Sequence, residues 1–269
     1  MKLSLEKIHS GCLFLHYAAA PVQFLILLLF IPVYAAAQDP SVLYSRANKA
    51  YSERKFEEAI LKYEEIVKSG NVSAEVYFNL GNAYYKSGNI PSAILNYERA
   101  RRLNPADADI EFNLRLAYLQ TIDKIEPAPE VFYKKWWNAF VNKLTADEHA
   151  KRALLFMWIA FAVALVYLFV NHSLFKKITF LIAGMLLVAS VFMIYLSAKQ
   201  VHSLRNNRAG VIFSTNVYVK GSPDEKSTNL FMLHAGTRVD VMDELQGWKR
   251  IRIANGNEGW IDASAIEII

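Results

Sequence analysis

Small and aromatic residues recur at helical spacing through residues 74–107. The pattern consists of Tyr77, Leu80, Gly81, Tyr84, Ala93, Tyr97, Ala100 and Pro105. It predicts two packed helices joined by a short turn, because Gly81 lets a second helix approach closely and Ala93 is the small residue opposite it. Tyr84 and Tyr97 are expected to fill the space between these helices. Pro105 cannot continue the second helix and is expected to follow its end.

The same pattern recurs 34 residues upstream and 34 residues downstream. The corresponding pairs are Ala47 and Gly81, Ala59 and Ala93, Tyr63 and Tyr97, Leu80 and Leu114, and Tyr84 and Tyr118. This period resembles that of the tetratricopeptide repeat, with Tyr77 in the place usually held by Trp. Three unrelated amphipathic helices are the alternative.

The repeats define the first soluble domain. The sequence predicts an all-α tetratricopeptide repeat domain over residues 40–124, with full repeats at 40–73 and 74–107 and a capping helix at 108–124. Arg115 takes the place of Gly81 in the third copy. This change fits a last helix that has no second helix packed against it.

The resemblance implies a partner-binding groove lined by the first helix of each repeat. Its residues would be Tyr44, Asn48, Tyr51, Phe78, Asn82, Tyr85 and Lys86. The two asparagines share one register position, where a carboxamide can hold both the N–H and the C=O of an extended peptide. Tyrosines offer a large contact area at low entropic cost. Phe78 replaces the lysine of the family's carboxylate clamp, which argues against a ligand held by its terminal carboxylate. Alternatively, the aromatic residues only fill space against a neighbouring helix.

Residues 1–37 have the pattern of a secretory signal peptide. Lys2 and Lys7 precede the apolar stretch 22–34, and three alanines at 35–37 offer small residues before a cleavage site. An uncleaved anchor helix is the alternative, although Pro21 and Pro32 interrupt it. In either case the following residues are expected to be exported.

Residues 125–145 are predicted to be a connector that contains an amphipathic helix at 130–144. Phe132, Trp136, Phe140 and Leu144 form one apolar stripe at intervals of four residues. Trp136 and Trp137 are residues of the kind that lie at headgroup depth, so we expect this helix to lie on the membrane surface. Packing against the repeat domain is the alternative.

Two long apolar stretches predict a transmembrane hairpin over residues 146–198. The spans 153–170 and 178–197 lack any charged residue, and a span of about 20 residues crosses a bilayer. A capping box at Thr145 and Glu148 is expected to begin the first helix, and residues 171–177 are expected to join the two spans. Both flanking domains would then lie on one side of the membrane. The spans hold no acid, base or histidine for a proton or ion pathway.

The orientation of this hairpin depends on two signals that disagree. A signal peptide would export the repeats, and both soluble domains would be periplasmic. The positive-inside rule argues the opposite, because the outer flanks of the spans carry more Lys and Arg than the joint with Lys176 and Lys177. We give the signal peptide more weight, because an exported repeat domain commits the residues after it. The predicted location is the bacterial inner membrane.

From residue 209 onward the chain consists of short alternating runs separated by turns. The runs at 216–220, 237–244, 248–253 and 258–262 predict strands of a small all-β barrel of about five strands. Trp248 and Ile251, then Gly259, Trp260 and Ile261, resemble motifs of the bacterial SH3-like domain, here residues 209–269. We expect a buried structural role for Trp260, with ligand binding as the alternative. Residues 221–229 would form a variable loop.

The remaining composition contains no chemistry that indicates an enzyme. The net charge is +5, and residues 134–208 hold ten Lys or Arg against two acids. These cations flank apolar spans, which favours anionic lipid headgroups and not nucleic acid as their partner. One cysteine, Cys12, allows neither an internal disulfide nor a cysteine metal site. The six histidines have no metal-ligand spacing, and no phosphate-binding or catalytic motif is present. We therefore predict neither a cofactor nor a metal.

The order of these segments resembles the BatE family, the repeat proteins of the bacterial aerotolerance operon. The resemblance covers essentially the whole chain and is most specific at residues 113–127 and at the Trp136-Trp137-Asn138 motif. It implies membrane partners, namely the von Willebrand-type Bat proteins and an AAA-type ATPase system, and a role in surviving oxidative or envelope stress. The leading hypothesis is a membrane-anchored adaptor. A sensor that contacts peptidoglycan through the SH3-like domain is the second hypothesis, and an enzyme or transporter is disfavoured.

Overall fold

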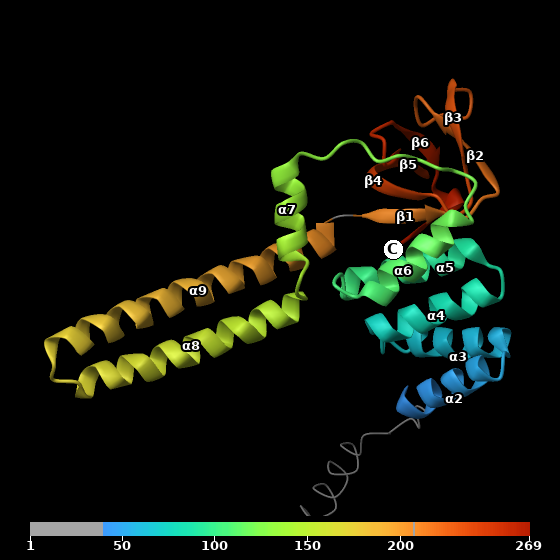
Figure 1. Ribbon diagram of the computed structural model, residues 1–269. Helices are drawn as coiled ribbons and strands as arrows, with labels where there is room; N and C mark the ends of the chain where they lie inside the picture. Colours follow the sequence, from blue (N-terminus) through green and yellow to red (C-terminus); the bar gives the residue numbers. More distant parts are fainter. Residues whose placement is uncertain (1–39, 207) are drawn as a thin grey trace, which may run out of the picture. The chain divides into compact units, whose positions relative to one another are not determined.

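Antiparallel helices begin the part of the chain that the computed structural model describes, residues 40–206 and 208–269 (Figure 1). The predicted signal peptide and Cys12 lie outside these residues. The helices are α2 (Pro40–Ser52), α3 (Phe56–Lys68), α4 (Ala74–Lys86), α5 (Ile90–Leu103) and α6 (Ala108–Leu119). The last three begin with side-chain caps, because Ser73, Asn89 and Asp107 accept hydrogen bonds from backbone N–H groups of the first turn. These helices form the all-α part of the fold.

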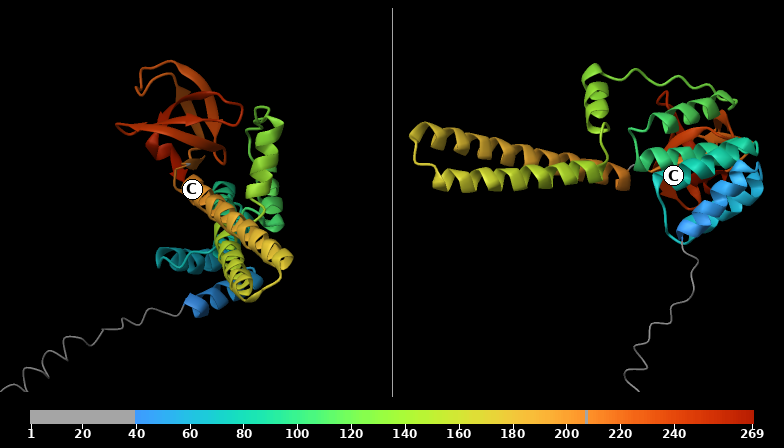
Figure 2. Two further views of the ribbon diagram at one scale, coloured as in Figure 1. Left: turned by 90° about the vertical axis from the view of Figure 1, so that its left-hand side faces the viewer. Right: turned by 60° about the horizontal axis from the view of Figure 1, so that its bottom comes forward.

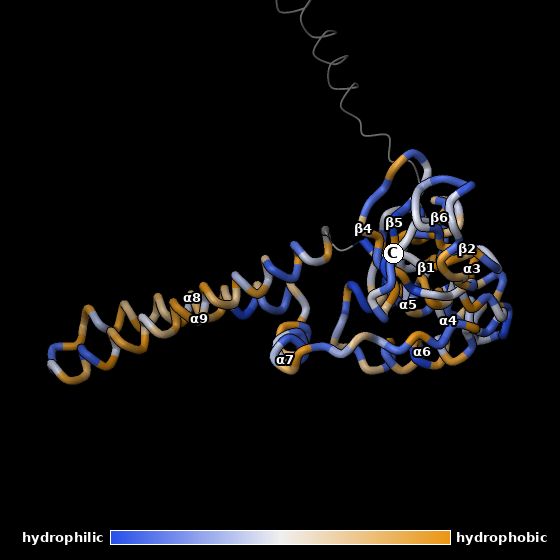
Figure 3. Tube along the Cα trace, turned by 90° about the horizontal axis from the view of Figure 1, so that it is seen from above, coloured by the Kyte–Doolittle hydropathy of each residue, from blue (hydrophilic) through white to orange (hydrophobic). Residues whose placement is uncertain are grey.

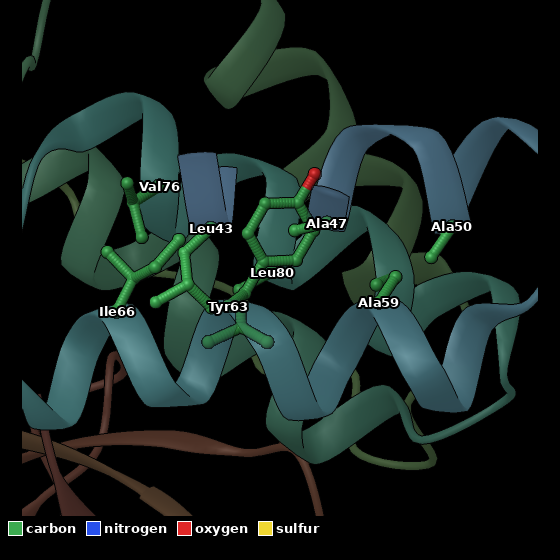
Figure 4. Packing of buried hydrophobic residues seen from close by; sticks show 9 residues of the cluster. Leu43, Ala47, Ala50, Ala59, Tyr63, Ile66, Val76 and Leu80 are labelled. Atoms are coloured by element: carbon green, nitrogen blue, oxygen red, sulfur yellow. The ribbon is translucent and has the colours of Figure 1, made fainter. Parts of the chain in front are cut away.

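Small residues and tyrosines make the core between these helices. Figure 4 shows the Tyr63 ring of α3 among Leu43 and Ala47 of α2 and Leu80 of α4. Gly81 has its predicted effect in the second repeat: a Cβ atom there would lie 2.7 Å from the Tyr97 ring. Close approach of α4 and α5 therefore requires glycine at this position.

The 34-residue period also appears in the partly buried hydrogen bonds between side chains. Tyr63 of α3 donates to Asn48 of α2, and Tyr97 of α5 donates in the same way to Asn82 of α4. Neighbouring repeats are joined by a second recurring bond, since Tyr84 donates to Glu64 and Tyr118 donates to Glu98. Each repeat is thus tied internally by a tyrosine–asparagine pair and to the next helix by a tyrosine–glutamate pair.

The capping helix α6 is shorter than expected. It ends at Leu119, not near residue 124, and the Lys124 ammonium donates to the carbonyls of Tyr118 and Leu119 at its C-terminus. The connector then leads to α7 (Phe132–Val141), which is also shorter than the predicted 130–144. Leu144 lies beyond its end, so Phe132, Trp136 and Phe140 make up the apolar stripe within the helix.

Two long helices follow and lie side by side, α8 (Ala146–Phe169) and α9 (Ser173–Asn206) (Figures 1 and 2). The capping box is present, since the Thr145 hydroxyl accepts from the Glu148 N–H and the Glu148 carboxylate accepts from the Thr145 N–H. Hydrophobic colouring follows most of both helices in Figure 3. Both are long and apolar enough to cross a membrane, by length and composition.

The joint of this hairpin differs from the prediction. The loop comprises residues 170–172, because α9 begins at Ser173 and includes Lys176 and Lys177. Lysine is a good helix former, so loss of apolar character does not end a helix. Between the helices, Ser190 donates to the Ala153 carbonyl at 2.8 Å and Ser197 donates to the Ala146 carbonyl at 2.9 Å. These contacts fix the register of the hairpin.

An antiparallel sheet forms the C-terminal part of the described chain. Its strands are β1 (Ala209–Ile212), β2 (Asn216–Lys220), β3 (Asn229–His234), β4 (Arg238–Leu245), β5 (Trp248–Arg252), β6 (Glu258–Asp262) and β7 (Ile266–Ile268), with a short 3-10 helix, η1, at Ala263–Ala265. The order in the sheet is β3-β2-β6-β5-β4-β1-β7. This is the predicted all-β SH3-like class, with more strands than the five expected. The alternation pattern had missed β1, β3 and β7.

The β part packs against the second repeat. Val211 of β1 is buried in one cluster with Ala93, Leu95 and Tyr97 of α5. The Arg99 guanidinium of α5 donates to the Ile268 carbonyl at 2.9 Å and pairs with Glu267 at 3.1 Å. The sequence patterns describe the repeats and the sheet separately, so they did not predict this contact between α5 and the C-terminal sheet.

Candidate binding surfaces

The predicted groove residues lie on the first helix of each repeat, α2 and α4. Tyr44, Tyr51, Phe78 and Tyr85 are half-buried, and Lys86 is exposed. Their aromatic rings also contact the second helices, since the Tyr44 ring lies 6.1 Å from Tyr63 and the Phe78 ring lies 5.9 Å from Tyr97. These side chains therefore stabilise the repeats and still present an open face.

The two asparagines are less available to a peptide than we expected. Asn82 Oδ1 accepts from the Tyr97 hydroxyl at 2.7 Å and from the Asn113 side chain at 2.8 Å. Asn48 Oδ1 accepts from the Tyr63 hydroxyl at 2.5 Å. A carbonyl oxygen has two lone pairs, so the Asn82 oxygen is fully used. The expected two-sided grip on a peptide backbone would require breaking these bonds.

Tyr44 is fixed by polar neighbours at one end of the groove. Its hydroxyl donates to Glu75 at 2.5 Å and accepts from Asn79 at 2.7 Å. Burial, together with the hydrogen bond to the Glu75 carboxylate, raises the pKa of Tyr44 to about 12. The hydroxyl consequently stays protonated and continues to donate even at a pH at which an ordinary tyrosine ionises.

The third copy of the first helix extends this face with apolar residues. Phe112 and Leu119 of α6 occupy the register positions of Phe78 and Tyr85, and their exposed fractions are 56% and 68%. Neither residue is among the predicted groove residues, although the 34-residue period indicates both. Leu116 similarly replaces Asn82. The face therefore changes from polar and aromatic at α2 to apolar at α6.

The outer face of the sheet is a second surface. Trp260 points outward with its cross-strand partners Lys220 and Arg250, while its neighbours Gly259 and Ile261 are buried. Trp248 and Trp260 are half-buried, so Trp260 is less buried than expected, and its structural or ligand-binding role stays a prediction. Strand alternation explains the exposure: inward positions 259 and 261 leave 260 facing outward.

Exposed apolar residues continue this outer face onto β2 and β3. Tyr218 lies opposite Met232 in the strand register, and both are exposed, as is Leu230. Lys220 lies above the Trp248 ring at 5.9 Å. The sheet therefore presents aromatic and aliphatic side chains interspersed with cations, an arrangement that suits ligands with both apolar and polar groups.

The aromatic side chains of α7 form a third exposed face. Trp136 stacks on Phe140 with ring centroids 6.0 Å apart, and Phe132 and Tyr133 are exposed. Trp137 is half-buried and lies under the Lys199 ammonium at 4.9 Å. Among the helix residues, Val141 alone is buried, so within the described chain this helix is not covered by the repeats.

No cluster of three metal-ligating side chains occurs within residues 40–206 and 208–269. Carboxylates that are buried there are used in structural contacts. The Asp123 carboxylate accepts from the Thr237 hydroxyl at 2.6 Å, the His234 N–H at 2.7 Å and the His234 ring at 2.7 Å. Burial tends to raise the pKa of Asp123, but the hydrogen bonds outweigh it and the pKa is lowered. This ionised carboxylate links the connector to the β3–β4 turn.

Two models of known families match parts of the chain. The tetratricopeptide repeat model matches residues 74–107, and the bacterial SH3 domain model matches residues 215–267. No curated protein matches the chain. Tetratricopeptide repeats indicate protein–protein interaction, and the bacterial SH3 domain is of the cell-wall-binding type. Both are typically non-catalytic binding modules, so the chain combines two kinds of binding domain with two helices able to cross a membrane.

Proposed function

We propose that this protein is a non-enzymatic adaptor anchored in the bacterial inner membrane, whose repeats hold a segment of a partner protein. The observation that supports this most strongly is the open face of α2, α4 and α6. Its side chains are aromatic or apolar at two of the shared register positions, Tyr44/Phe78/Phe112 and Tyr51/Tyr85/Leu119, and the opposite side of the second repeat is already occupied by the β domain. A face left uncovered on a rigid repeat is a natural site for a partner segment.

The contacts of Asn48 and Asn82 change the expected mode of binding. Since their oxygens hold tyrosine hydroxyls, we assign them to positioning the groove and not to the peptide backbone. Affinity would come from burying apolar side chains against Tyr51, Tyr85 and Phe112. Lys86 would add a charge contact at the rim.

We further propose that the partners are the von Willebrand-type Bat membrane proteins with their AAA-type ATPase system, in a complex that protects against oxidative or envelope stress. This part rests on the resemblance of the whole segment order to the BatE family. The hairpin would hold the repeats and the β domain in the periplasm, while α7 with Trp136 and Trp137 would lie at the lipid surface.

The adaptor function can be tested with a matched pair of surface variants. Phe112→Ser changes the open face, whereas Leu61→Ser changes an equally exposed apolar residue on the second helix of the first repeat; both are more than half exposed. The tagged full chain is purified from membranes that contain the von Willebrand-type partners. We expect recovery of those partners to fall several-fold with Phe112→Ser and to stay unchanged with Leu61→Ser. Equal recovery from both variants and the native chain would refute binding through this face.

The topology requires a separate measurement. Ser52 and Ser222 lie in the repeats and the β domain, so each is changed to cysteine and labelled in intact cells with a reagent that does not cross the inner membrane. The signal peptide predicts labelling at both positions. Labelling at one position and not the other would contradict the hairpin.

Contact with peptidoglycan through the β domain is a second candidate function. It is favoured by the outward position of Trp260 beside Lys220 and Arg250, on a face that also exposes Tyr218 and Met232. Pull-down of the full chain on purified cell wall, with Trp260→Ala beside Leu61→Ala as an exposed control on α3, tests it. Retention that depends on Trp260 supports the sensor, and no retention of the native chain excludes it.

A further inference from the structure

A cavity of about 640 Å³ lies beside α6, where the second helix of a third repeat would be expected. It adjoins the open face of α2, α4 and α6, because Leu119 belongs to that face and also lines the cavity. Helix α6 contributes Arg115, Tyr118 and Leu119 to its wall. The volume falls within the range of about 300–1,000 Å³ that is usual for ligand sites.

Helix α6 cannot accept a second helix of the repeat type at this place. In the second repeat, glycine at position 81 is required because the Tyr97 ring lies 2.7 Å from where a Cβ would be. The corresponding residue of α6 is Arg115, whose side chain would collide with such a helix. In the second repeat Asn82 accepts a hydrogen bond from the Tyr97 hydroxyl, but the corresponding residue of α6 is Leu116, whose side chain cannot accept one. The cavity is therefore not a vacant position for another repeat.

The connector and the β domain close the cavity. Thr121 is buried, Ile125 packs against the core of the β domain, and the Ala128 N–H donates to the Ala254 carbonyl at 2.9 Å. Apolar wall is supplied by Leu119, Ile125, Pro127 and Ala254. One side of the site is consequently apolar and rigidly held.

The other side of the cavity contains an arginine–glutamate–arginine cluster. The Glu98 side chain is 4% exposed, and it accepts from the Tyr118 hydroxyl at 2.6 Å and pairs with Arg101 at 2.5 Å. The Arg238 Nε lies 3.6 Å from Glu98, too far for a hydrogen bond, and this buried N–H has no acceptor within the described chain. A buried donor without an acceptor is costly, and a ligand oxygen would relieve that cost.

The cations around the cavity differ in how far they are already paired. Four cations line it, namely Arg101, Arg115, Lys124 and Arg238. Arg101 pairs with Glu98 and, at 3.8 Å, with Glu111, and the Arg238 Nη2 pairs with Asp240 at 3.0 Å. Arg115 is exposed and has no ion pair among the described residues. The Arg238 Nε and the Arg115 guanidinium are therefore the donors left for a ligand, and the two oxygens of one carboxylate match these two donors better than a doubly charged phosphate does.

We propose that this cavity binds a carboxylate carried next to a bulky apolar side chain on a peptide segment, with the oxygen at Arg238 and Arg115 and the apolar group against Leu119 and Ile125. Apart from Leu119, the site lies outside the groove proposed for the adaptor, so it would give this protein a second peptide contact. The carboxylate is either a chain terminus or an acidic side chain, and the probes below distinguish these sources.

Ligand-observed saturation-transfer NMR on the full chain in nanodiscs tests the site, with empty nanodiscs as the background. The probes are acetyl-Ala-Leu-Leu with a free C-terminus, its C-terminal amide, and acetyl-Ala-Leu-Glu-amide. We expect the first or third probe to bind and the amide to bind at least about fivefold more weakly, since the amide lacks the charge. Binding of the first indicates a terminus, and binding of the third indicates a side chain. Equal binding of the amide, or binding of no probe, overturns the proposal.

Variants place the binding in this cavity. Arg238→Gln should weaken binding of the carboxylate probe about tenfold, as for a lost charged hydrogen bond. Arg115→Gln should weaken it about two- to fivefold, as for an exposed ion pair, and its exposure means that folding does not depend on it. Arg46→Gln, an exposed arginine on α2, is the matched control and should have no effect. Binding that is the same in Arg115→Gln and Arg46→Gln would contradict the assignment even if Arg238→Gln failed to fold.

Discussion

The second helices of the two repeats, α3 and α5, occupy the same place in the repeat pattern and have opposite surroundings. Leu61 of α3 and Leu95 of α5 share one register position, yet Leu61 is 67% exposed and Leu95 is 3% exposed. The difference is the β domain, which covers α5. The residues near this position also differ between the two helices. Glu65 and Lys68 of α3 correspond to Arg99 and Arg102 of α5.

Arg99 explains why the β domain docks on this copy, and Arg102 adds a further contact. Arg99 donates to the Ile268 carbonyl and pairs with Glu267, and Arg102 donates to the Ile269 carbonyl at 2.7 Å. Glutamate at the first position would repel Glu267 and could not donate to a carbonyl. The comparison teaches that an internal repeat preserves the core spacing while its outward positions specialise for different neighbours.

The largest effect is expected from truncating the leucine at this shared position. Leu95→Ala should lower the free energy of unfolding by about 2–5 kcal/mol, because it leaves a cavity under the β domain. Leu61→Ala, its matched control, should change it by no more than about 0.5 kcal/mol. Denaturant titration of the full chain in detergent, followed by tryptophan fluorescence, measures both. Similar losses from the two variants would mean that the β domain does not cover α5.

Removing the Asp123 charge is the next test. Asp123→Asn should destabilise the contact between connector and β domain by about 1.5–3 kcal/mol, because three donors lose an ionised acceptor. Because the pKa of Asp123 is lowered in the folded protein, the stability that its carboxylate contributes depends on pH. This stabilisation is present above the unfolded pKa of about 3.9 and is lost as the pH falls through the lower folded pKa. Limited proteolysis within residues 121–128 between pH 7 and 3 follows it. Cleavage that is equally fast in the native chain and in Asp123→Asn at neutral pH would be the contrary result.

A smaller and more local effect is expected at the glycine position of the repeats. Gly81→Ala should cost about 1–3 kcal/mol, because the new methyl group meets the buried Tyr97 ring. Arg115→Ala at the corresponding place on α6 should be close to neutral, since no second helix lies there. Thermal unfolding of both variants measures the difference. Equal shifts would show that α6 is as tightly packed as α4.

Much of the fold followed from the sequence, because its patterns have a local cause. The 34-residue period predicted the helices, the close approach of a second helix at Gly81 and the lack of a second helix after Arg115, although it placed Ala93 opposite Gly81 where the structure has the Tyr97 ring. Strand alternation gave β2 and β6 their observed bounds. It missed β1 and β7, since these short strands are defined by their partners in the sheet and carry no alternation of their own.

The candidate surfaces were predicted less completely for a related reason. Tyr44, Tyr51, Phe78 and Tyr85 were identified from their register position. Phe112 and Leu119 have the same register but were assigned to a capping helix. The sequence did not show that the Asn82 oxygen accepts hydrogen bonds from both Tyr97 and Asn113, because these bonds depend on the angles between three helices.

The sequence by itself determined the kinds of domain in this protein: helical repeats, two helices of membrane-spanning length and a small β domain. Periodicity is a property of neighbouring residues, and the folding of each element follows from it. Only the tertiary structure decided that the β domain covers α5, that Asp123 binds the β3–β4 turn and that a cavity lies beside α6. These contacts join residues more than a hundred positions apart, and shape and charge complementarity between folded surfaces select them.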